Sequence, residues 1–272
     1  MVAPSFPVDF DKNELITALR ELGFDKVCDH SVAIATVNLE YQSLFKKDQC
    51  APIIAANCPA TVALIKNRFP NLVKYLPNIP SPMVMNARLC HRWWPRNRNV
   101  FIGPCLAKKQ EAKTCPEVEL VLTYKEIMEV FKERGVVVGK GNEGGRGSGG
   151  SETEIGFDGP SEKGVKIFPA SGGMKATLKM DASNCRKIVV ADETLNLIKI
   201  FDPTLPRSGG ATLGAGEHNN CVFYDVLACP GGCLGGPGVI SGDDKTGLKQ
   251  KLLEFIKEEG EGPLCSEADT NG

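Results

Sequence analysis

The chain has 272 residues, of which 42% are apolar, enough for one large domain or two closely packed lobes around a buried core. Its 32 Lys and Arg residues balance 33 Asp and Glu residues, and this even charge argues against a nucleic-acid partner. Its apolar runs are far shorter than the ~20 residues of a membrane span, and no secretion signal opens it. We therefore expect a soluble, cytoplasmic protein without a membrane partner.

Helical and strand-like segments alternate along the first half of the sequence. Apolar residues at helical spacing predict a helix over 11–23, which Gly23 ends. A helix is also predicted over 61–69, after a Cys-Pro pair whose proline suits a first helical turn. We expect a short buried strand over 99–103 and an amphipathic helix over 123–134.

The composition changes beyond this helix. Residues 139–164 are rich in Gly, Ser and charged side chains, so we expect a flexible insertion or loop within a single domain over 1–272. Strands are predicted over 187–191 and 221–228, and a terminal helix over 248–257. Strands that alternate with helices predict an α/β fold with mostly parallel sheets, in which ligands bind where strands end in loops.

Eleven cysteines are the chemical peculiarity of the sequence. Their number is odd and no secretion signal is present, so a disulfide framework is not expected. Four of them lie in three loops beside Gly or Pro: Cys58, Cys105, Cys229 and Cys233. Gly and Pro turns leave the backbone room to approach a bulky inorganic group. We predict that these four thiolates bind a 4Fe–4S cluster, which requires four such ligands.

Other interpretations of the cysteines remain open. Zinc also takes four thiolates, but its ligands usually come in two close pairs, and here only Cys229 and Cys233 are close in sequence. Buried cysteines in tight turns would need no ligand at all. The remaining cysteines match no motif, and we interpret them as buried or incidental: Cys28, Cys50, Cys90, Cys115, Cys185, Cys221 and Cys265.

Lys108 follows Cys105 by three residues, so both side chains can face one site. A lysine there can hold an anionic ligand as a compact point charge, and Glu111 can pair with it across one helical turn. Lys108 can equally be a solvated lysine at the start of a helix, which is what we expect of Lys109.

The three loops resemble the three signature motifs of the catalytic domain of iron-only (FeFe) hydrogenases. Those motifs read Thr-Ser-Cys-Cys-Pro, then Met-Pro-Cys-x-x-Lys-x-x-Glu, then Glu-x-Met-Ala-Cys-x-x-Gly-Cys-x-x-Gly-Gly. The matching residues, in order, are Cys58, Pro59, Pro104, Cys105, Lys108, Glu111, Ala228, Cys229, Gly232, Cys233, Gly235 and Gly236. The likeness covers nearly the whole chain apart from the glycine-rich segment.

The resemblance implies a fold of two α/β lobes with the cluster site between them. The four loop cysteines would bind the 4Fe–4S cluster, and Cys233 would also bridge to a di-iron subcluster with CO, CN and dithiolate ligands, the dithiolate carrying a bridgehead amine. Lys108 would hydrogen-bond a cyanide, and Pro104 and Ser171 would lie against the cofactor. The implied activity is the interconversion of protons and dihydrogen. Implied partners are maturation proteins and a ferredoxin-like electron partner or a fused sensory or redox domain.

Departures from the family motifs point to a divergent branch that is slow or senses hydrogen. Asn57 stands where the family has a proton-relay thiol, and an amide has no proton that ionises near neutral pH. Ser81 and Glu40 match other relay positions, but Ser43 replaces a second relay glutamate. Gly103 replaces a methionine that packs on the di-iron unit.

The alternative is a protein that holds only a 4Fe–4S cluster and serves as a carrier or assembly scaffold. Eukaryotic relatives in cytosolic iron–sulfur assembly share the three loops and also lack the relay thiol. They carry additional N-terminal cysteines for a second cluster, which this sequence lacks. Asp225 replaces a glutamate of the third motif, and the sequence provides no physical reason for that change.

Overall fold

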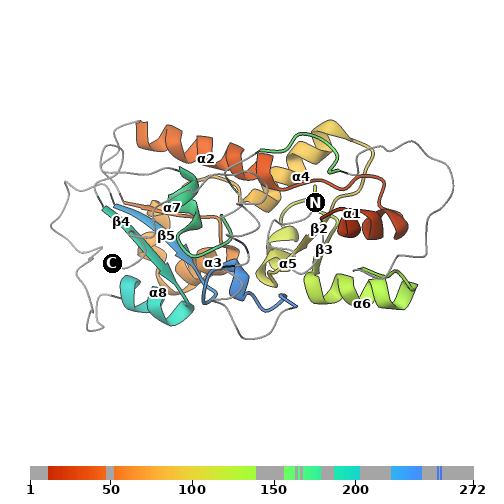
Figure 1. The fold of residues 1–272 in the computed structure, drawn as a ribbon. Coiled ribbons are helices and arrows are strands. Elements are labelled where there is room, and N and C mark those ends of the chain that lie inside the picture. Colours follow the sequence, from red (N-terminus) through yellow and green to blue (C-terminus); the bar gives the residue numbers. More distant parts are fainter. Residues whose placement is uncertain are drawn as a thin grey trace.

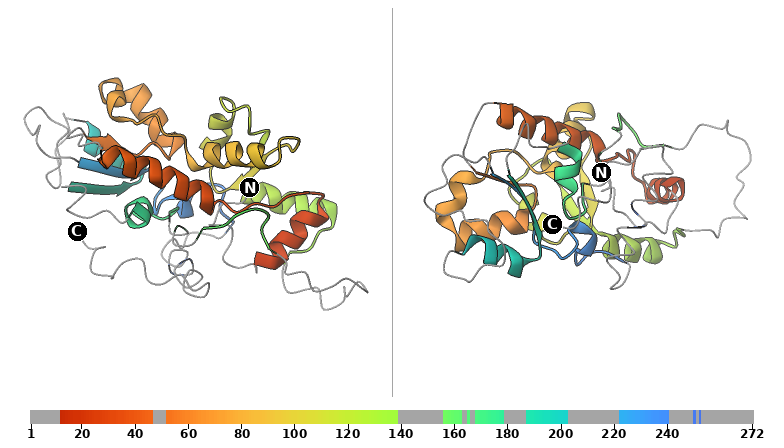
Figure 2. Two further views of the ribbon diagram at one scale, coloured as in Figure 1. Left: turned by 90° about the horizontal axis from the view of Figure 1, so that it is seen from above. Right: turned by 60° about the vertical axis from the view of Figure 1, so that its left-hand side comes forward.

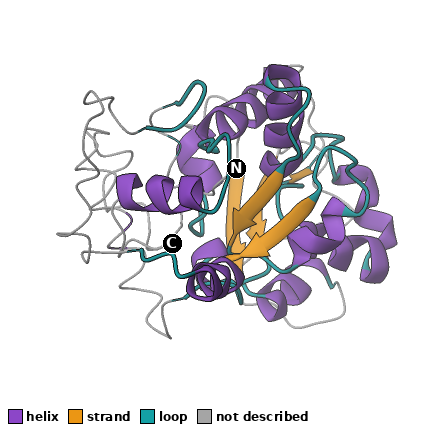
Figure 3. Cartoon of the chain, turned by 90° about the vertical axis from the view of Figure 1, so that its right-hand side faces the viewer, coloured by secondary structure: helices purple, strands orange, loops and turns teal. Residues whose placement is uncertain are grey.

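The computed structural model of the chain describes residues 12–46, 52–138, 156–162, 165, 168–178, 187–202, 222–240, 250 and 252. Within them the strands form two parallel sheets in the interior, with helices around them (Figure 1, Figure 3). We name the two halves of the molecule after their sheets, the two-stranded lobe and the three-stranded lobe.

The two-stranded lobe contains β2 (Val100–Gly103) and β3 (Leu120–Thr123), which pair in parallel. A parallel pair needs a crossover connection, and this one contains the short helix α5 (Ala107–Ala112). Longer helices pack around the pair: α1 (Lys12–Glu21), α4 (Pro82–Trp93) and α6 (Tyr124–Arg134). Ile16, Met83 and Tyr124 belong to the single apolar core that joins these elements.

The three-stranded lobe has the strand order β1-β5-β4, and all its strands are parallel. The strands are β1 (Ile53–Ile54), β4 (Lys187–Asp192) and β5 (Val222–Leu227). Its helical elements are α2 (Ser31–Lys46), α3 (Pro59–Arg68), the 3-10 helix η1 (Pro70–Tyr75), α7 (Gly173–Leu178) and α8 (Thr194–Phe201).

Alternating side chains give this sheet two apolar faces. Ile53 and Phe223 are paired in the register and share a core with residues of α2 and α7. Ile54 and Tyr224, the next pair, share a second core with residues of α3, η1 and α8. Because helices cover both faces, the buried strands are apolar almost throughout.

Local sequence signals set several of the helix ends. Thr123 caps α6 through a capping box with Glu126, and Gly135 ends the helix in the left-handed conformation with φ 71°. Pro59 occupies the first turn of α3, where its missing N–H costs nothing. For this reason α3 begins two residues earlier than the predicted helix over 61–69.

The prediction of an α/β fold with parallel sheets in two lobes is confirmed. The strands predicted over 187–191 and 221–228 are β4 and β5, and the helix predicted over 11–23 is α1. The predicted terminal helix over 248–257 lies outside the described residues except at positions 250 and 252.

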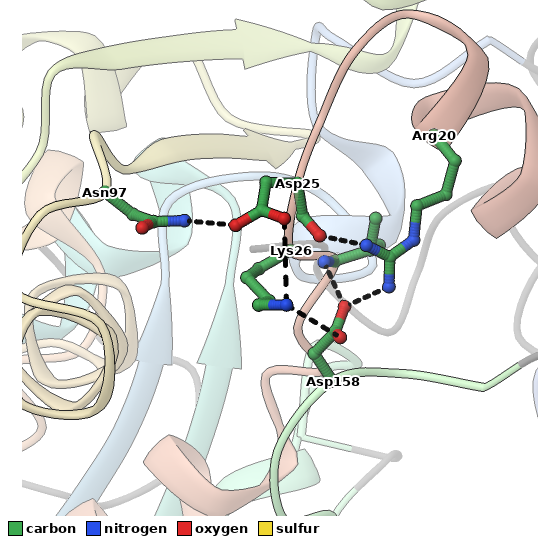
Figure 4. Close-up of polar contacts among 6 residues, drawn as sticks. Arg20, Asp25, Lys26, Asn97 and Asp158 are labelled. Atoms are coloured by element: carbon green, nitrogen blue, oxygen red, sulfur yellow. Dashed lines mark hydrogen bonds and ion pairs between the residues drawn. The ribbon is translucent and has the colours of Figure 1, made fainter.

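The structure describes part of the segment predicted as a glycine-rich insertion. The first part of the predicted segment, 139–164, lies outside the described residues, but 156–162 packs against the two-stranded lobe. Asp158 accepts a hydrogen bond from the backbone N–H of Val27 at 2.7 Å and forms an ion pair with Arg20 (Figure 4). These two charge-assisted contacts of Asp158 hold residues 156–162 against the lobe. Composition alone does not reveal them.

The two lobes are joined by α2, which packs against α4 of the two-stranded lobe and α7 of the three-stranded lobe. Figure 1 and Figure 2 show this long helix lying over the three-stranded lobe and reaching the middle of the molecule. Contact between α3 and α5 connects the lobes a second time. These contacts place the loops after β1, β2 and β5 next to one another.

Candidate metal centre

Three loops that follow strands carry the predicted cluster ligands. Cys58 lies between β1 and α3, and Cys105 lies between β2 and α5. Cys229 follows β5, and Cys233 begins the short 3-10 helix η2 (Cys233–Gly235). Since ligands of α/β sheets gather beyond the carboxyl ends of the strands, this is the expected place for a binding site.

Backbone hydrogen bonds hold the loop of Cys229 and Cys233 against two segments, the one before α7 and the loop of Cys105. The N–H of Cys233 donates to the carbonyl of Pro169 at 2.7 Å, and the N–H of Gly238 donates to the carbonyl of Pro104 at 3.0 Å. A Cβ on Gly236 would lie only 2.6 Å from the same Pro104 carbonyl oxygen. Glycine at this position is therefore required by the close approach of the second and third loops.

The four thiols are close enough to influence one another's ionisation. Burial raises the pKa of Cys233 well above its usual value, and neighbouring Cys105, Cys58 and Cys229 raise that pKa further, whereas Lys108 lowers it. Burial likewise raises the pKa of Cys105. Deprotonating all four would place several negative charges in one partly buried space, which is unfavourable unless a cationic group lies between them.

The thiols do not converge on one point. Among the described residues, no three His, Cys, Asp or Glu side chains lie close enough together to hold one metal ion. Four thiolates bound to one zinc ion at ~2.3 Å would have to lie within about 4 Å of one another. Each thiolate of a 4Fe–4S cluster binds a different iron, so the sulfurs stand further apart. Four cysteines from neighbouring loops are the donor set that such a cluster needs.

Lys108 lies in the same region, buried with only 8% of its surface exposed. Its ammonium donates to the Ser81 hydroxyl at 2.8 Å and to the Glu111 carboxylate at 2.7 Å, and it lies 3.5 Å from the backbone oxygen of Asn57. The predicted pairing of Lys108 with Glu111 is present. By contrast, Lys109 is more exposed and pairs with Glu126.

A cavity adjoins Cys105 and Cys233. Lys108 and Asn57 are among the residues that line it, and the exposed surface of its wall is almost entirely apolar. The side chains and loop residues around it are His30, Ile34, Asn57, Pro82, Met83, Phe101, Pro104, Cys105, Lys108, Phe168, Pro169 and Cys233. An apolar cavity with a few placed polar groups beside a metal-ligand set is the expected form of a small-molecule or cofactor site.

The side-chain amide of Asn57 is held by a hydrogen bond to a residue other than the four loop cysteines. Its side-chain NH₂ donates to the Met174 sulfur at 2.7 Å. Its side-chain oxygen is buried and has no hydrogen-bond partner among the described residues. The residue itself is 8% exposed.

Sequence reasoning missed His30 and Asn86. His30 is 5% exposed, lines the cavity, and lies 2.8 Å through Nδ1 from the Asn86 side-chain nitrogen. The same Asn86 nitrogen also donates to the carbonyl of Asp29, so it is a donor and Nδ1 is the acceptor. The proton of the neutral ring is therefore on Nε2. Burial, with Lys108 nearby, lowers the pKa of His30 to about 3.

Two predicted site residues lie apart from this group. Glu40 is exposed on α2 and lines a second cavity together with Ser43 and Lys74, separate from the one beside Cys233. Ser171 is half-buried and lies against the third loop, where a Cβ on Gly232 would come within 2.7 Å of the Ser171 nitrogen. Its neighbours Phe168 and Pro169, rather than Ser171, line the cavity.

The structure provides reasons for two departures from the family motifs. A Cβ on Gly103 would lie 2.5 Å from the ring of Phe101, so that ring occupies the space a longer residue would need. Asp225 is buried on β5 and accepts a hydrogen bond from the backbone N–H of Lys175 at 2.9 Å, in the first turn of α7. Asp225 thus anchors the helix that follows the loop lining the cavity.

Comparison with known proteins places the chain in a family. Residues 1–237 match the family described as iron only hydrogenase large subunit, C-terminal domain. The NADP-reducing hydrogenase subunit HndD of Solidesulfovibrio fructosivorans is 27% identical over an alignment of 288 positions, which covers 87% of this chain and 46% of that protein. The chain thus spans about half the length of this relative.

Two further comparisons extend this result. The cytosolic Fe-S cluster assembly factor NAR1 of Yarrowia lipolytica is 21% identical, over 85% of this chain and 61% of that protein. A solved structure of FeFe-hydrogenase HydA1 from Chlamydomonas reinhardtii superposes with a TM-score of 0.68 at 20% identity, over 96% of this chain and 83% of that one. This likeness shows a shared fold. No helix of the described residues combines the length and apolarity needed to cross a membrane. The chain belongs to the iron-only hydrogenase large-subunit family.

Proposed function

We propose that the chain binds a 4Fe–4S cluster through Cys58, Cys105, Cys229 and Cys233, and a di-iron subcluster with CO, CN and dithiolate ligands in the adjoining cavity. Its activity would be a slow, or hydrogen-sensing, interconversion of protons and dihydrogen. The observation that carries this proposal is the arrangement of four mutually interacting thiols beside a cavity lined by a buried lysine.

The residues around the cavity suit an anionic ligand in a dry site. The Lys108 ammonium has three N–H donors, Ser81 and Glu111 hold it in place, and Lys108 is among the residues that line the cavity. Apolar residues such as Phe101 and Phe168 exclude water, which strengthens the interaction between the lysine and a negative ligand. When bound, the di-iron group would supply the iron chemistry that joins protons and electrons.

The groups available for proton delivery favour a slow turnover of hydrogen. Asn57 stands beside the cluster ligand Cys58, and its amide neither holds nor releases a proton near neutral pH. The Ser81 hydroxyl is already engaged by Lys108 at 2.8 Å. Glu40 lies at the surface beside a different cavity, so a relay through Glu40 is not part of this proposal.

A second candidate function is that of a 4Fe–4S carrier or assembly scaffold. The likeness to the assembly factor of Yarrowia lipolytica, together with Asn57 in place of a relay thiol, favours it. The two candidates differ in whether the cavity beside Cys233 takes a second iron unit. For either, a cytoplasmic location and a ferredoxin-like electron partner belong to the proposal, and maturation proteins to the first candidate only.

Iron counting together with infrared spectroscopy distinguishes the candidates. The chain would be reconstituted anaerobically with iron and sulfide, and then incubated with a synthetic di-iron unit. We expect iron to rise from about four to about six per chain, with infrared bands from iron-bound CO and CN. Iron that stays at about four without those bands would favour the carrier. Cys233→Ser is the control, since it should reduce both the cluster and the bands.

A further inference from the structure

A short segment at the end of β4 lies against the loop that carries Cys229 and Cys233. Asp192, the last residue of β4, is paired in the parallel register with Leu227, the last residue of β5. Parallel neighbours end at the same edge of a sheet, so residues 192–194 lie beside the residues that follow β5 (Figure 1). The end of β4 is therefore in a position to support the cysteine loop.

Two hydrogen bonds join this segment to the cysteine loop, one on each side of Cys229. The Asp192 carboxylate accepts a hydrogen bond from the backbone N–H of Gly231 at 2.9 Å. The Thr194 hydroxyl donates a hydrogen bond to the backbone carbonyl of Ala228 at 3.2 Å. The chain is therefore held immediately before and shortly after Cys229.

The residue between these two side chains has an unusual backbone conformation. Glu193 has φ 68°, and it is the one described residue other than glycine with a positive φ. The Cβ of an ordinary residue makes this conformation unfavourable, so it persists only where the surrounding contacts fix it. The hydrogen bonds of Asp192 and Thr194, on either side of Glu193, are contacts of this kind.

The Asp192 carboxylate also brings a negative charge to the cysteine loop. None of the ion pairs between described residues involves Asp192. Its partner Gly231 lies between Cys229 and Cys233, two of the proposed ligands. The potential of a 4Fe–4S cluster depends on the charge around it, and reduction adds one electron. A carboxylate beside the loop therefore makes reduction less favourable.

We propose that Asp192 is a positioning residue of the 4Fe–4S site, which holds the loop of Cys229 and Cys233 and lowers the reduction potential of the bound cluster through its charge. This inference rests on the proposed ligation of a cluster by the four loop cysteines. It applies to both candidate functions, because the di-iron unit has no part in it. Thr194 supports the same loop without adding a charge.

Two substitutions separate the charge of Asp192 from its hydrogen bond. Asp192→Asn removes the charge but keeps an oxygen that can accept from Gly231, whereas Asp192→Ala removes both. Each full-length variant is reconstituted anaerobically with iron and sulfide. The reduction potential is measured by titration with dithionite, followed by electron paramagnetic resonance of the reduced cluster. The rate at which a chelator removes iron from the oxidised cluster measures how firmly the loop is held.

Asp158→Asn is the matched control for the loss of charge. The Asp158 carboxylate also accepts a hydrogen bond from a backbone N–H, that of Val27, outside the three cysteine loops. Thr194→Val is the matched control for the loss of a contact, because it removes a neutral hydrogen bond to the same loop. The first should change neither the potential nor the rate of iron loss, and the second should change only the rate.

We expect Asp192→Asn to raise the potential by about 28 mV or more, which is an about threefold higher ratio of reduced to oxidised cluster at a fixed potential. Its rate of iron loss should stay within about twofold of the wild-type rate, since an acceptor for Gly231 remains. Asp192→Ala should lose iron about tenfold faster, because the loop loses a charge-assisted hydrogen bond.

A wild-type potential in Asp192→Asn, or a wild-type rate of iron loss in Asp192→Ala, would overturn the assignment of Asp192 and leave the proposed cluster intact. An equal rise of the potential in Asp158→Asn would also overturn it, because the effect would then not depend on the cysteine loop. A wild-type chain that binds no iron–sulfur cluster would overturn the proposed function and the assignment with it. The iron content of the wild type therefore separates the two failures.

Discussion

At the level of single residues, the ion pair between Lys108 and Glu111 is the most consequential polar contact of the site. Their side chains are only 11% and 17% exposed, and their charged atoms lie 2.7 Å apart. Removing one partner of such a pair leaves the other charge poorly solvated, which costs more than the pair itself contributes. Lys108 therefore contributes to the stability of the folded protein and also forms part of the cavity lining.

Lys108→Met should lower the free energy of unfolding by about 1–3 kcal/mol, because Glu111 loses its cation in a partly buried position. The double variant Lys108→Met/Glu111→Gln should recover part of that loss. Urea unfolding of the apo protein measures both. Lys109→Met is the control and should change stability by no more than about 1 kcal/mol, since its partner Glu126 is more exposed. A Lys108 variant as stable as the Lys109 variant would contradict this argument.

His30 should make the folded protein sensitive to mild acid. The pKa of His30 is about 3 in the folded chain and about 6.5 when unfolded. Between these values the unfolded state binds the proton more readily, so the free energy of unfolding decreases as the pH falls from 6.5. The upper limit of the effect is roughly 5 kcal/mol. His30→Asn, which keeps an acceptor for Asn86, should flatten the fall in urea-unfolding free energy between pH 7 and 4.5.

Asp225 provides an internal comparison of opposite sign. Burial raises the pKa of Asp225 to about 6 from an ordinary value of 3.8, so the folded state binds this proton more readily than the unfolded state. Protonation of Asp225 between pH 6 and 3.8 therefore adds to the free energy of unfolding, and Asp225→Asn should steepen the fall of that free energy at acid pH.

Identical pH profiles for the wild type and His30→Asn would argue against a buried neutral imidazole.

The residues that the sequence identified and those that it missed differ in a physical way. Cys105 and Lys108 lie in one motif, where spacing along the chain already indicates a shared site. His30, Asn86 and Phe101 come to the cavity from separate elements, and only tertiary packing brings them together. An Asp-His-Ser run at the start of a helix was the one available signal for His30, and it is not specific.

At the level of elements, the strand β2 and its glycine end control the wall of the cavity. Phe101 is 3% exposed, and its ring fills the space beside Gly103 and lies 5.4 Å from the ring of His30. A methionine at position 103 and a phenylalanine at position 101 therefore compete for one volume. This competition explains how the strand accommodates the departure from the family motif.

Gly103→Met should lower the free energy of unfolding by about 1–3 kcal/mol, because it overpacks this wall. The double variant Gly103→Met/Phe101→Ala should be more stable than the sum of the two single effects, since each change makes room for the other. Denaturant unfolding of the four proteins completes the cycle. Strict additivity would mean that the two side chains do not share the space.

Element types followed well from periodicity, and element ends followed from local chemistry. The capping box at Thr123 and the proline at position 59 fixed the starts of α6 and α3, each within two residues of the expected position. The packing of residues 156–162 could not be predicted, because it depends on contacts of Asp158 with Arg20 and with the backbone of Val27, which are distant in sequence.

At the level of the whole molecule, the four cysteines come from both lobes. Cys58 and Cys229 follow strands of the three-stranded lobe, and Cys105 follows a strand of the two-stranded lobe. A cluster bound by both lobes should stabilise them together, because binding to the folded state alone is folding free energy.

Anaerobic loading with iron and sulfide should raise stability by about 3 kcal/mol at a hundredfold excess over the dissociation constant. Thermal unfolding followed by circular dichroism should then show one transition at a higher Tm. Cys58→Ser should abolish most of the increase, whereas Cys115→Ala, which alters a buried thiol outside the three loops, should keep it. An increase of the same size in Cys58→Ser would mean that the bound metal lies elsewhere.

The parallel pairing of β1 with β5 has a consequence for how the protein is made. Val100 pairs with Leu120, which is close to it in the sequence, whereas Ile53 pairs with Phe223, which is synthesised much later. On the ribosome, the two-stranded sheet can form early, but the strand that pairs with β1 in the described part of the chain, β5, is synthesised much later. Cys58 and Cys105 therefore spend part of synthesis without Cys229 and Cys233, and iron delivered then would meet an incomplete set of ligands. A cluster bound by all four cysteines could form only after residue 233 has emerged from the ribosome.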